Sequence, residues 1–178
     1  MTNQNRHGDR MMTVSGRTFW PLDPRPEEIA IEDIAHSLAH QCRYAGHTRA
    51  FYSVAQHSVL VAQNLPPELR LWGLLHDASE AYLVDLPRPV KRFITGYAEA
   101  EDRLMRCIAD RFGLCWPCPP QVKRVDAAIL TDEMQQLMPR LPEGMRPGLG
   151  IKISPMHPRR AMVEFMEMAG TLLSEDAT

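Results

Sequence analysis

Apolar residues recur every three or four positions along most of the chain, and this helical spacing constrains the fold more than any other feature. No stretch alternates strongly with period two, so no substantial sheet is expected. The 178 residues favour one domain. We predict an all-α helical bundle at 19–178, preceded by a flexible N-terminus at 1–18. The expected helices run over 31–44, 53–65, 67–83, 90–112, from near 120, and over 160–173.

Composition excludes several classes of function. Lysine and arginine number 20 against 22 acidic residues, a net charge of −2, so no basic field favours nucleic acid as a partner. No apolar run approaches membrane-spanning length, and the N-terminus lacks a signal-peptide core. We therefore expect a cytoplasmic protein with no membrane partner and with its four cysteines reduced.

Two regions rich in proline are interpreted as loops. Cys115 and Cys118 have the spacing of a redox or zinc motif, but they lie in a proline-rich turn and the other cysteines form no second pair. We interpret them as idle or buried thiols. Residues 139–158 predict a long surface loop, which could act as a lid.

Polar residues interrupt the apolar faces of three expected helices. His57, His76 with Asp77, and Asp126 each lie on such a face. One such residue is usually a hydrogen-bonded core residue, but burying two imidazoles and two carboxylates together costs several kcal/mol without a partner, and no Lys or Arg shares these faces. One divalent ion would satisfy all four. Two nitrogens and two carboxylates favour Mn²⁺, Co²⁺ or Zn²⁺, with Ni²⁺ and Mg²⁺ also open.

The order of these ligands resembles the HD superfamily of metal-dependent phosphohydrolases, whose pattern is a histidine, a His-Asp pair and a distant aspartate. The resemblance spans about residues 31–137. It is closest to the 5′-deoxynucleotidases and to the phage deoxynucleoside triphosphate triphosphohydrolases, which carry runs similar to residues 76–80, 85–87 and 89–91. Two-metal branches have further histidines before the last aspartate. None occurs at 78–125, which favours a single metal.

The resemblance implies two catalytic carboxylates. Glu80 lies one helical turn after His76 and matches the family glutamate that positions or deprotonates the attacking water. The alternative is an ordinary glutamate on a helix surface, but the face that Glu80 shares with His76 argues against it. Asp85 matches the aspartate near the attacking water and the leaving sugar oxygen, although an aspartate before Leu-Pro is also typical of a turn.

Substrate residues follow from the same comparison. Arg43 and Tyr44 match an arginine-aromatic pair that contacts phosphate and sugar, and Lys91 and His47 are further phosphate candidates. Pro89 matches a base-pocket proline. Tyr44 and Gly46, however, replace the bulky residues that close the pocket in the adenine-specific phage enzymes, which puts strict adenine selectivity in doubt.

These expectations define a nucleotide hydrolase, with deoxynucleoside monophosphates ahead of triphosphates. A triphosphohydrolase of the phage type, or a phosphohydrolase of a cyclic or signalling nucleotide, stays open. The alternative outside enzymes is a catalytically idle HD-fold module that binds a ligand or partner. The resemblance also implies a homo-oligomer, because relatives self-associate.

Overall fold

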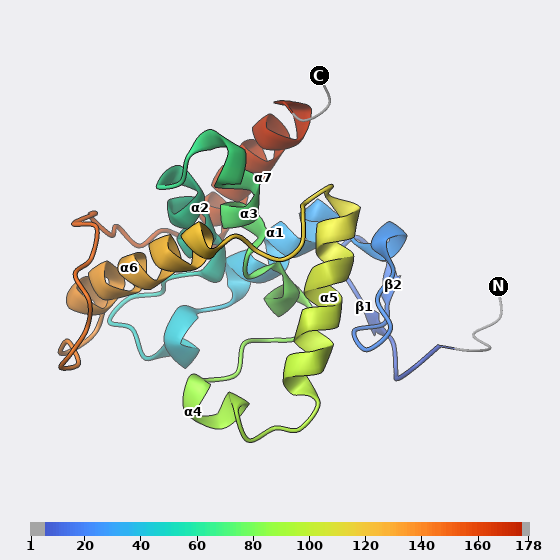
Figure 1. Cartoon of the computed structure of the whole chain (residues 1–178), viewed down its shortest axis with the longest axis horizontal. Coiled ribbons are helices and arrows are strands. Elements are labelled where there is room, and N and C mark those ends of the chain that lie inside the picture. The colour runs from blue at the N-terminus through green and yellow to red at the C-terminus, as the bar shows by residue number, and fades with distance from the viewer. Residues whose placement is uncertain (1–5, 176–178) are drawn as a thin grey trace.

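Helices make up most of residues 6–175, the part of the chain that this computed structural model describes (Figure 1). Over these residues the only sheet is a hairpin, β1 with β2. The prediction of an all-α fold is confirmed. The elements are β1 (Met11–Met12), β2 (Thr18–Phe19), α1 (Ile31–His40), α2 (Val54–Gln63), α3 (Arg70–Leu75), α4 (Arg88–Lys91), α5 (Tyr97–Arg111), α6 (Pro120–Leu137) and α7 (Pro158–Glu175).

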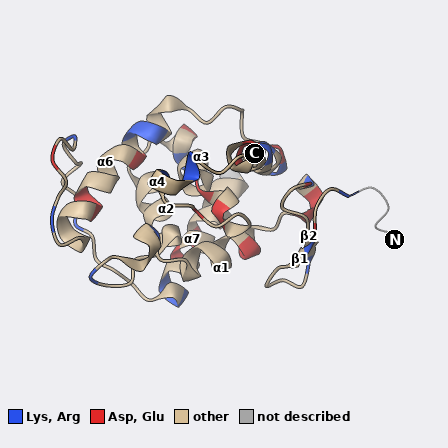
Figure 2. Cartoon of the chain, turned by 90° about the horizontal axis from the view of Figure 1, so that it is seen from below, with Lys and Arg blue, Asp and Glu red and all other residues tan. Residues whose placement is uncertain are grey.

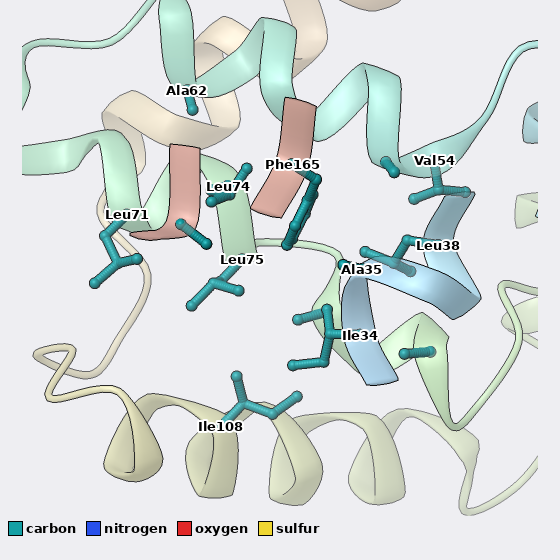
Figure 3. Close-up of a cluster of buried hydrophobic side chains, with 14 of the residues drawn as sticks. Ile34, Ala35, Leu38, Val54, Ala62, Leu71, Leu74, Leu75, Ile108 and Phe165 are labelled. Atoms are coloured by element: carbon teal, nitrogen blue, oxygen red, sulfur yellow. The ribbon is translucent and has the colours of Figure 1, made fainter. Parts of the chain in front are cut away.

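One core joins the helices. α2 packs against α3 and α7, and α1 packs against α2 and α7. In Figure 3, Ile34 of α1, Leu75 of α3, Ile108 of α5 and Phe165 of α7 point toward one another, and all four are fully buried. Each such side chain contributes about 1.5–3 kcal/mol by leaving water. α6 lies beside α2, so residues on its facing side can reach the first histidine.

The expected helix over 31–44 is wrong in its last turn. α1 ends at His40, and the backbone of residues 41–43 pairs instead with residues 52–54: Val54 N–H donates to Gln41 O, and Arg43 N–H donates to Tyr52 O. Tyr44 and Ala45 then adopt left-handed conformations, with φ of 56° and 50°. Gly46 therefore does not cap α1.

The expected helix over 67–83 is also interrupted. α3 stops at Leu75, and a short 3-10 turn follows at Ala78–Ala81. Side chains of α1 and of the residue after it bind the carbonyls of this turn: Ser37 donates to Ala81 O and Gln41 donates to Glu80 O. Tertiary contacts thus override the helical pattern, and His76 and Asp77 lie between the end of α3 and the start of the 3-10 turn.

Two further boundaries have different outcomes. The helix expected at 90–112 divides into α4, which ends at Lys91, and α5, which begins at Tyr97 directly after Gly96, whose φ of 82° lies outside the right-handed helix. The start of α2 is confirmed, since the Ser53 side chain accepts a hydrogen bond from Gln56 N–H as an N-cap.

The N-terminal segment is more ordered than expected over residues 6–18. It contains β1, and Arg6 donates to Glu28 at 2.7 Å. Ser15 donates through both its N–H and its hydroxyl to the buried Asp33. Residues 1–5 of the predicted flexible segment lie outside the described residues.

The loop between α6 and α7 is held by polar side chains of the bundle. Asp132 accepts hydrogen bonds from the N–H groups of residues 149–151, and Gln136 donates to Ile151 O. Gln56 of α2 donates to Ser154 O and accepts from Met156 N–H. These contacts hold residues 149–156 against α6 and α2; whether the loop acts as a lid stays a prediction.

Charged residues are spread over the described chain. Figure 2 shows basic and acidic segments interspersed, as the near-zero net charge suggests. Among residues 6–175, no helix combines the length and the apolar character needed to cross a membrane.

Candidate metal centre

Three side chains from separate elements converge on one point. His57 of α2, His76 after α3 and Asp126 of α6 offer ligand atoms that all lie within 4.8 Å of one another. Nε2 of His57 is 3.3 Å from Nε2 of His76 and 3.2 Å from Oδ1 of Asp126. This grouping could bind a metal ion, and it unites three of the four ligands that the sequence predicted.

The outer nitrogens of both imidazoles already have partners. Nδ1 of His57 donates to Glu133 Oε1 at 2.6 Å, and Nδ1 of His76 donates to Gly73 O at 2.8 Å. A neutral imidazole that donates from Nδ1 carries a lone pair on Nε2. Two lone pairs therefore face each other across 3.3 Å beside carboxylates, an arrangement of acceptors that a metal ion or a proton could satisfy.

Asp77, the fourth predicted ligand, borders the same point. Its Oδ2 is 3.2 Å from Nε2 of His76 and 3.9 Å from Nε2 of His57, while Arg43 approaches it at 3.4 Å. Burial opposes ionisation, but the neighbouring His76 and His57 outweigh it and hold the pKa of Asp77 well below its usual range. Asp77 is therefore an anion beside the three converging ligands.

In the absence of a metal, a proton can take its place. Burial lowers the pKa of His76, but the carboxylates of Asp77 and Asp126 outweigh this and raise it to about 9. Burial likewise opposes charge on Asp126, but its closeness to His57 and His76 outweighs this and lowers its pKa. The site thus attracts positive charge, and metal binding competes with protonation.

Glu80 lies buried next to these ligands. Burial first, then the negative charges of Asp77 and Asp85, raise its pKa to about 10. Its carboxyl is therefore neutral near pH 7 when no cation is bound. A cation held by Asp77 would offset the second of these causes, so the pKa of Glu80 should fall in the metal-loaded protein.

Arg43 and Tyr44 reach the site from the left-handed turn after α1. Arg43 Nε donates to Glu133 at 3.2 Å, its Nη1 donates to Asp77 at 3.4 Å, and Tyr44 OH donates to Glu133 at 2.6 Å. Burial opposes the charge on Arg43, yet Glu133 and Asp77 more than compensate and raise its pKa. Arg43 thus contacts one predicted ligand, Asp77, whereas Tyr44 is bound to Glu133; their roles toward a substrate stay predictions.

Asp85 and Lys91 form a second group. Lys91 Nζ is 2.6 Å from Glu101 and 3.7 Å from Asp85. Burial raises the pKa of Asp85, and Lys91 opposes the rise. Residues of both groups influence Glu80: Asp77 and Asp85 raise its pKa, and Arg43 and Lys91 oppose the rise.

The remaining predicted residues are not brought to the ligands by any hydrogen bond within residues 6–175. His47 is exposed, and its N–H donates to Tyr44 O. Pro89 is exposed at the start of α4.

Sequence reasoning gave no role to Glu133, although its helical spacing placed it on the apolar face of α6. It is fully buried and accepts from four side chains, including the Tyr52 hydroxyl at 2.8 Å. Burial opposes its ionisation, but His57 and Arg43 outweigh this and lower the pKa of Glu133 to about 2. The sequence signal for Glu133 was its position two helical turns after Asp126.

Glu101, which forms an ion pair with Lys91, was also given no role from the sequence.

The fold and the converging ligands define an all-α protein with a candidate metal centre, and the relatives give its family. No protein-family model matches the chain. It is 38% identical over 162 residues to the uncharacterized protein YfdR of Escherichia coli, covering 87% of this chain and 90% of that protein. The chain therefore belongs to the same family as YfdR.

A second relative is similar over a shorter stretch. The uncharacterized protein RCAP_rcc00048 of Rhodobacter capsulatus is 45% identical over 121 residues, 62% of each chain. The names of the two relatives assign them no activity.

Proposed function

We propose that this chain is a metal-dependent phosphohydrolase that cleaves phosphate esters of nucleotides, with deoxynucleoside monophosphates as preferred substrates. One observation carries the proposal: Nε2 of His57 and Nε2 of His76 face each other at 3.3 Å beside Asp77 and Asp126, with both outer nitrogens already hydrogen-bonded. Such a donor set fits one divalent ion. The resemblance to HD phosphohydrolases supplies the reaction and the substrate class.

Four residues would hold the ion: His57, His76, Asp77 and Asp126. When bound, it supplies positive charge that offsets the charge of the phosphate and acidifies a water molecule. Arg43 orients the phosphate through Nη2, which makes no hydrogen bond with the described residues. Its guanidinium is held rigid by the carboxylates on its other nitrogens.

Two carboxylates move the protons. Glu80 accepts a proton from the water while the oxygen of that water forms a bond to phosphorus. The ester bond between phosphorus and the 5′ oxygen breaks, and Asp85, whose pKa is raised, donates a proton to the leaving oxygen. Lys91 keeps Asp85 in place and favours an anionic substrate. The products are a nucleoside and orthophosphate.

A substrate panel tests the proposal. Purified protein, stripped with chelator and reloaded with Mn²⁺, Co²⁺ or Zn²⁺, is incubated with deoxynucleoside mono- and triphosphates, and orthophosphate, pyrophosphate and triphosphate are measured separately. We expect orthophosphate from monophosphates, and loss of both metal and activity in Asp126→Asn. Release of triphosphate alone would assign the triphosphohydrolase reaction. Bound metal with no phosphate release from any substrate would support the non-catalytic module.

The remaining expectations, a cytoplasmic location and homo-oligomeric assembly, stay predictions. Size-exclusion chromatography with light scattering tests the second.

A further inference from the structure

Glu133 accepts more hydrogen bonds from side chains than any other described carboxylate. It lies on α6 with no exposed surface. Its Oε1 accepts from His57 Nδ1 at 2.6 Å and from Tyr52 OH at 2.8 Å, and its Oε2 accepts from Tyr44 OH at 2.6 Å and from Arg43 Nε at 3.2 Å. Both oxygens are thus fully used.

The identity of these donors argues against a purely structural carboxylate. A buried carboxylate needs one cation and enough donors, which any nearby groups could supply. Here one donor is a candidate metal ligand, His57, and two others are Arg43 and Tyr44, the residues assigned to the phosphate and the sugar. Tyr52 alone has no place in the proposed chemistry. The same carboxylate therefore contacts both halves of the site.

The turn that carries Arg43 and Tyr44 also needs support. Tyr44 and Ala45 are consecutive non-glycine residues at φ 56° and 50°, a left-handed conformation that L-residues disfavour. Such strain persists only where surrounding contacts impose it. The bonds from Arg43 and Tyr44 to Glu133 are contacts of this kind, because they join the turn to α6.

We propose that Glu133 is the positioning residue of the site. Its Oε1 fixes the ring of His57 with the lone pair of Nε2 facing His76 and Asp126, and its Oε2 holds the strained turn so that Arg43 reaches the same point. This inference rests on the proposed metal centre. Glu133 contacts neither metal nor substrate, and it acts only through His57, Arg43 and Tyr44.

Glu133→Gln separates this role from simple packing, because the amide keeps the size of the side chain. One of its two terminal atoms becomes a donor, so it can accept from either His57 or Arg43 but not from both. Facing His57, the amide nitrogen would move the imidazole proton to Nε2 and remove the ligand lone pair. Tyr52→Phe is the matched control, because it removes one hydrogen bond from the same carboxylate without touching a ligand.

Two measurements on the full-length chain provide the readout. Equilibrium dialysis with Mn²⁺ and Co²⁺ gives metal affinity, and long-range ¹H–¹⁵N spectra of the metal-free protein give the tautomer of His57. We expect Glu133→Gln to weaken metal binding 10- to 100-fold and to populate the tautomer protonated at Nε2. We expect Tyr52→Phe to stay within threefold of the wild type and to keep the original tautomer.

The outcomes separate this inference from the proposed function. If the wild type binds neither ion, the metal centre itself fails. If the wild type binds metal but Glu133→Gln matches it within threefold and keeps the tautomer, only the role of Glu133 fails. An equal loss of affinity in Tyr52→Phe would also overturn it. If Glu133→Gln does not fold, Glu133→Asp serves instead: the shorter carboxylate cannot hold both His57 and Arg43 as Glu133 does, so metal affinity should fall at least threefold, and an unchanged affinity refutes the role.

Discussion

Replacement of Glu80 by glutamine should stabilise the metal-free protein while it abolishes activity. Glu80 is 8% exposed, and burial together with Asp77 and Asp85 raises its pKa from 4.5 to about 10. At pH 7.5 the folded protein therefore holds a proton that the unfolded chain has lost. Stability then falls as pH rises above 4.5, because the folded state binds more protons. Glutamine does not ionise in either state, so Glu80→Gln removes this loss of stability at high pH.

The magnitude follows from the gap between pH 7.5 and 4.5. Three pH units at about 1.4 kcal/mol each set a ceiling of about 4 kcal/mol. Burial of the amide group costs part of this free energy. We therefore expect the free energy of unfolding to increase by at least about 1 kcal/mol, or Tm to rise by roughly 2–4 °C. Near pH 4 both states of the wild type are protonated, and the gain should vanish.

Thermal melts in chelator at pH 4 and pH 7.5 measure this gain, with exposed Glu143→Gln as the control that should change little. Metal-loaded protein should show a smaller gain, because a cation at Asp77 offsets part of the penalty. The same variant should lose about 10²- to 10⁴-fold in turnover if Glu80 moves the proton. A lower Tm for Glu80→Gln at pH 7.5 would refute the electrostatic reasoning, and full activity would refute the catalytic role.

Three further results are expected. In chelator, the free energy of unfolding should decrease as pH rises from 6.5 to 9. His76, with its pKa raised to about 9, is stabilised by protonation below 6.5 and loses this on deprotonation, and Glu80 adds to the same slope. Saturating metal should reduce the slope, and a flat profile in chelator would count against the site. Gly148→Ala should destabilise by about 1–3 kcal/mol in urea unfolding, because the new Cβ would overlap with the Asp132 carboxylate, whereas Gly170→Ala, at an open helix position, should not. Thiol reagents should modify exposed Cys115 quickly and spare Cys107, whose pKa burial raises to about 12; equal labelling in native protein would contradict this burial.

Helical spacing and caps predicted those parts of the fold that depend on local sequence. Ser53 marks the start of α2, and Pro120 marks the start of α6, as expected. Interruptions set by distant contacts could not be predicted in this way. The end of α1 depends on backbone pairing between residues 41–43 and 52–54, and the 3-10 turn after Asp77 depends on side chains at 37 and 41.

The candidate site shows the same contrast between residues found from the local helical pattern and a role that depends on distant contacts. His57, His76 and Asp126 could be found because a polar residue on an apolar stripe is visible in a helical pattern. Glu133 was visible on its stripe too, but its role was not, because three of its four donors lie at residues 43–52, more than 80 positions away. A glutamate on a helix usually faces water. The hydrogen bonds that Arg43 and Tyr44 of the strained turn make to α6 show that Glu133 faces the protein interior instead.

Charge balance gives a physical reason for a divalent ion at this point. Asp77, Asp126 and Glu133 all have lowered pKa values and are ionised near neutral pH, while Arg43 is the only permanent cation that contacts them in the described chain. Three anions and one cation leave two negative charges in a largely buried site. A proton on His76 neutralises one of them, whereas one divalent ion neutralises both and also satisfies the facing nitrogens. The protein should therefore prefer a doubly charged ion to protons once such an ion is present, and its affinity should rise with pH as His76 loses its proton.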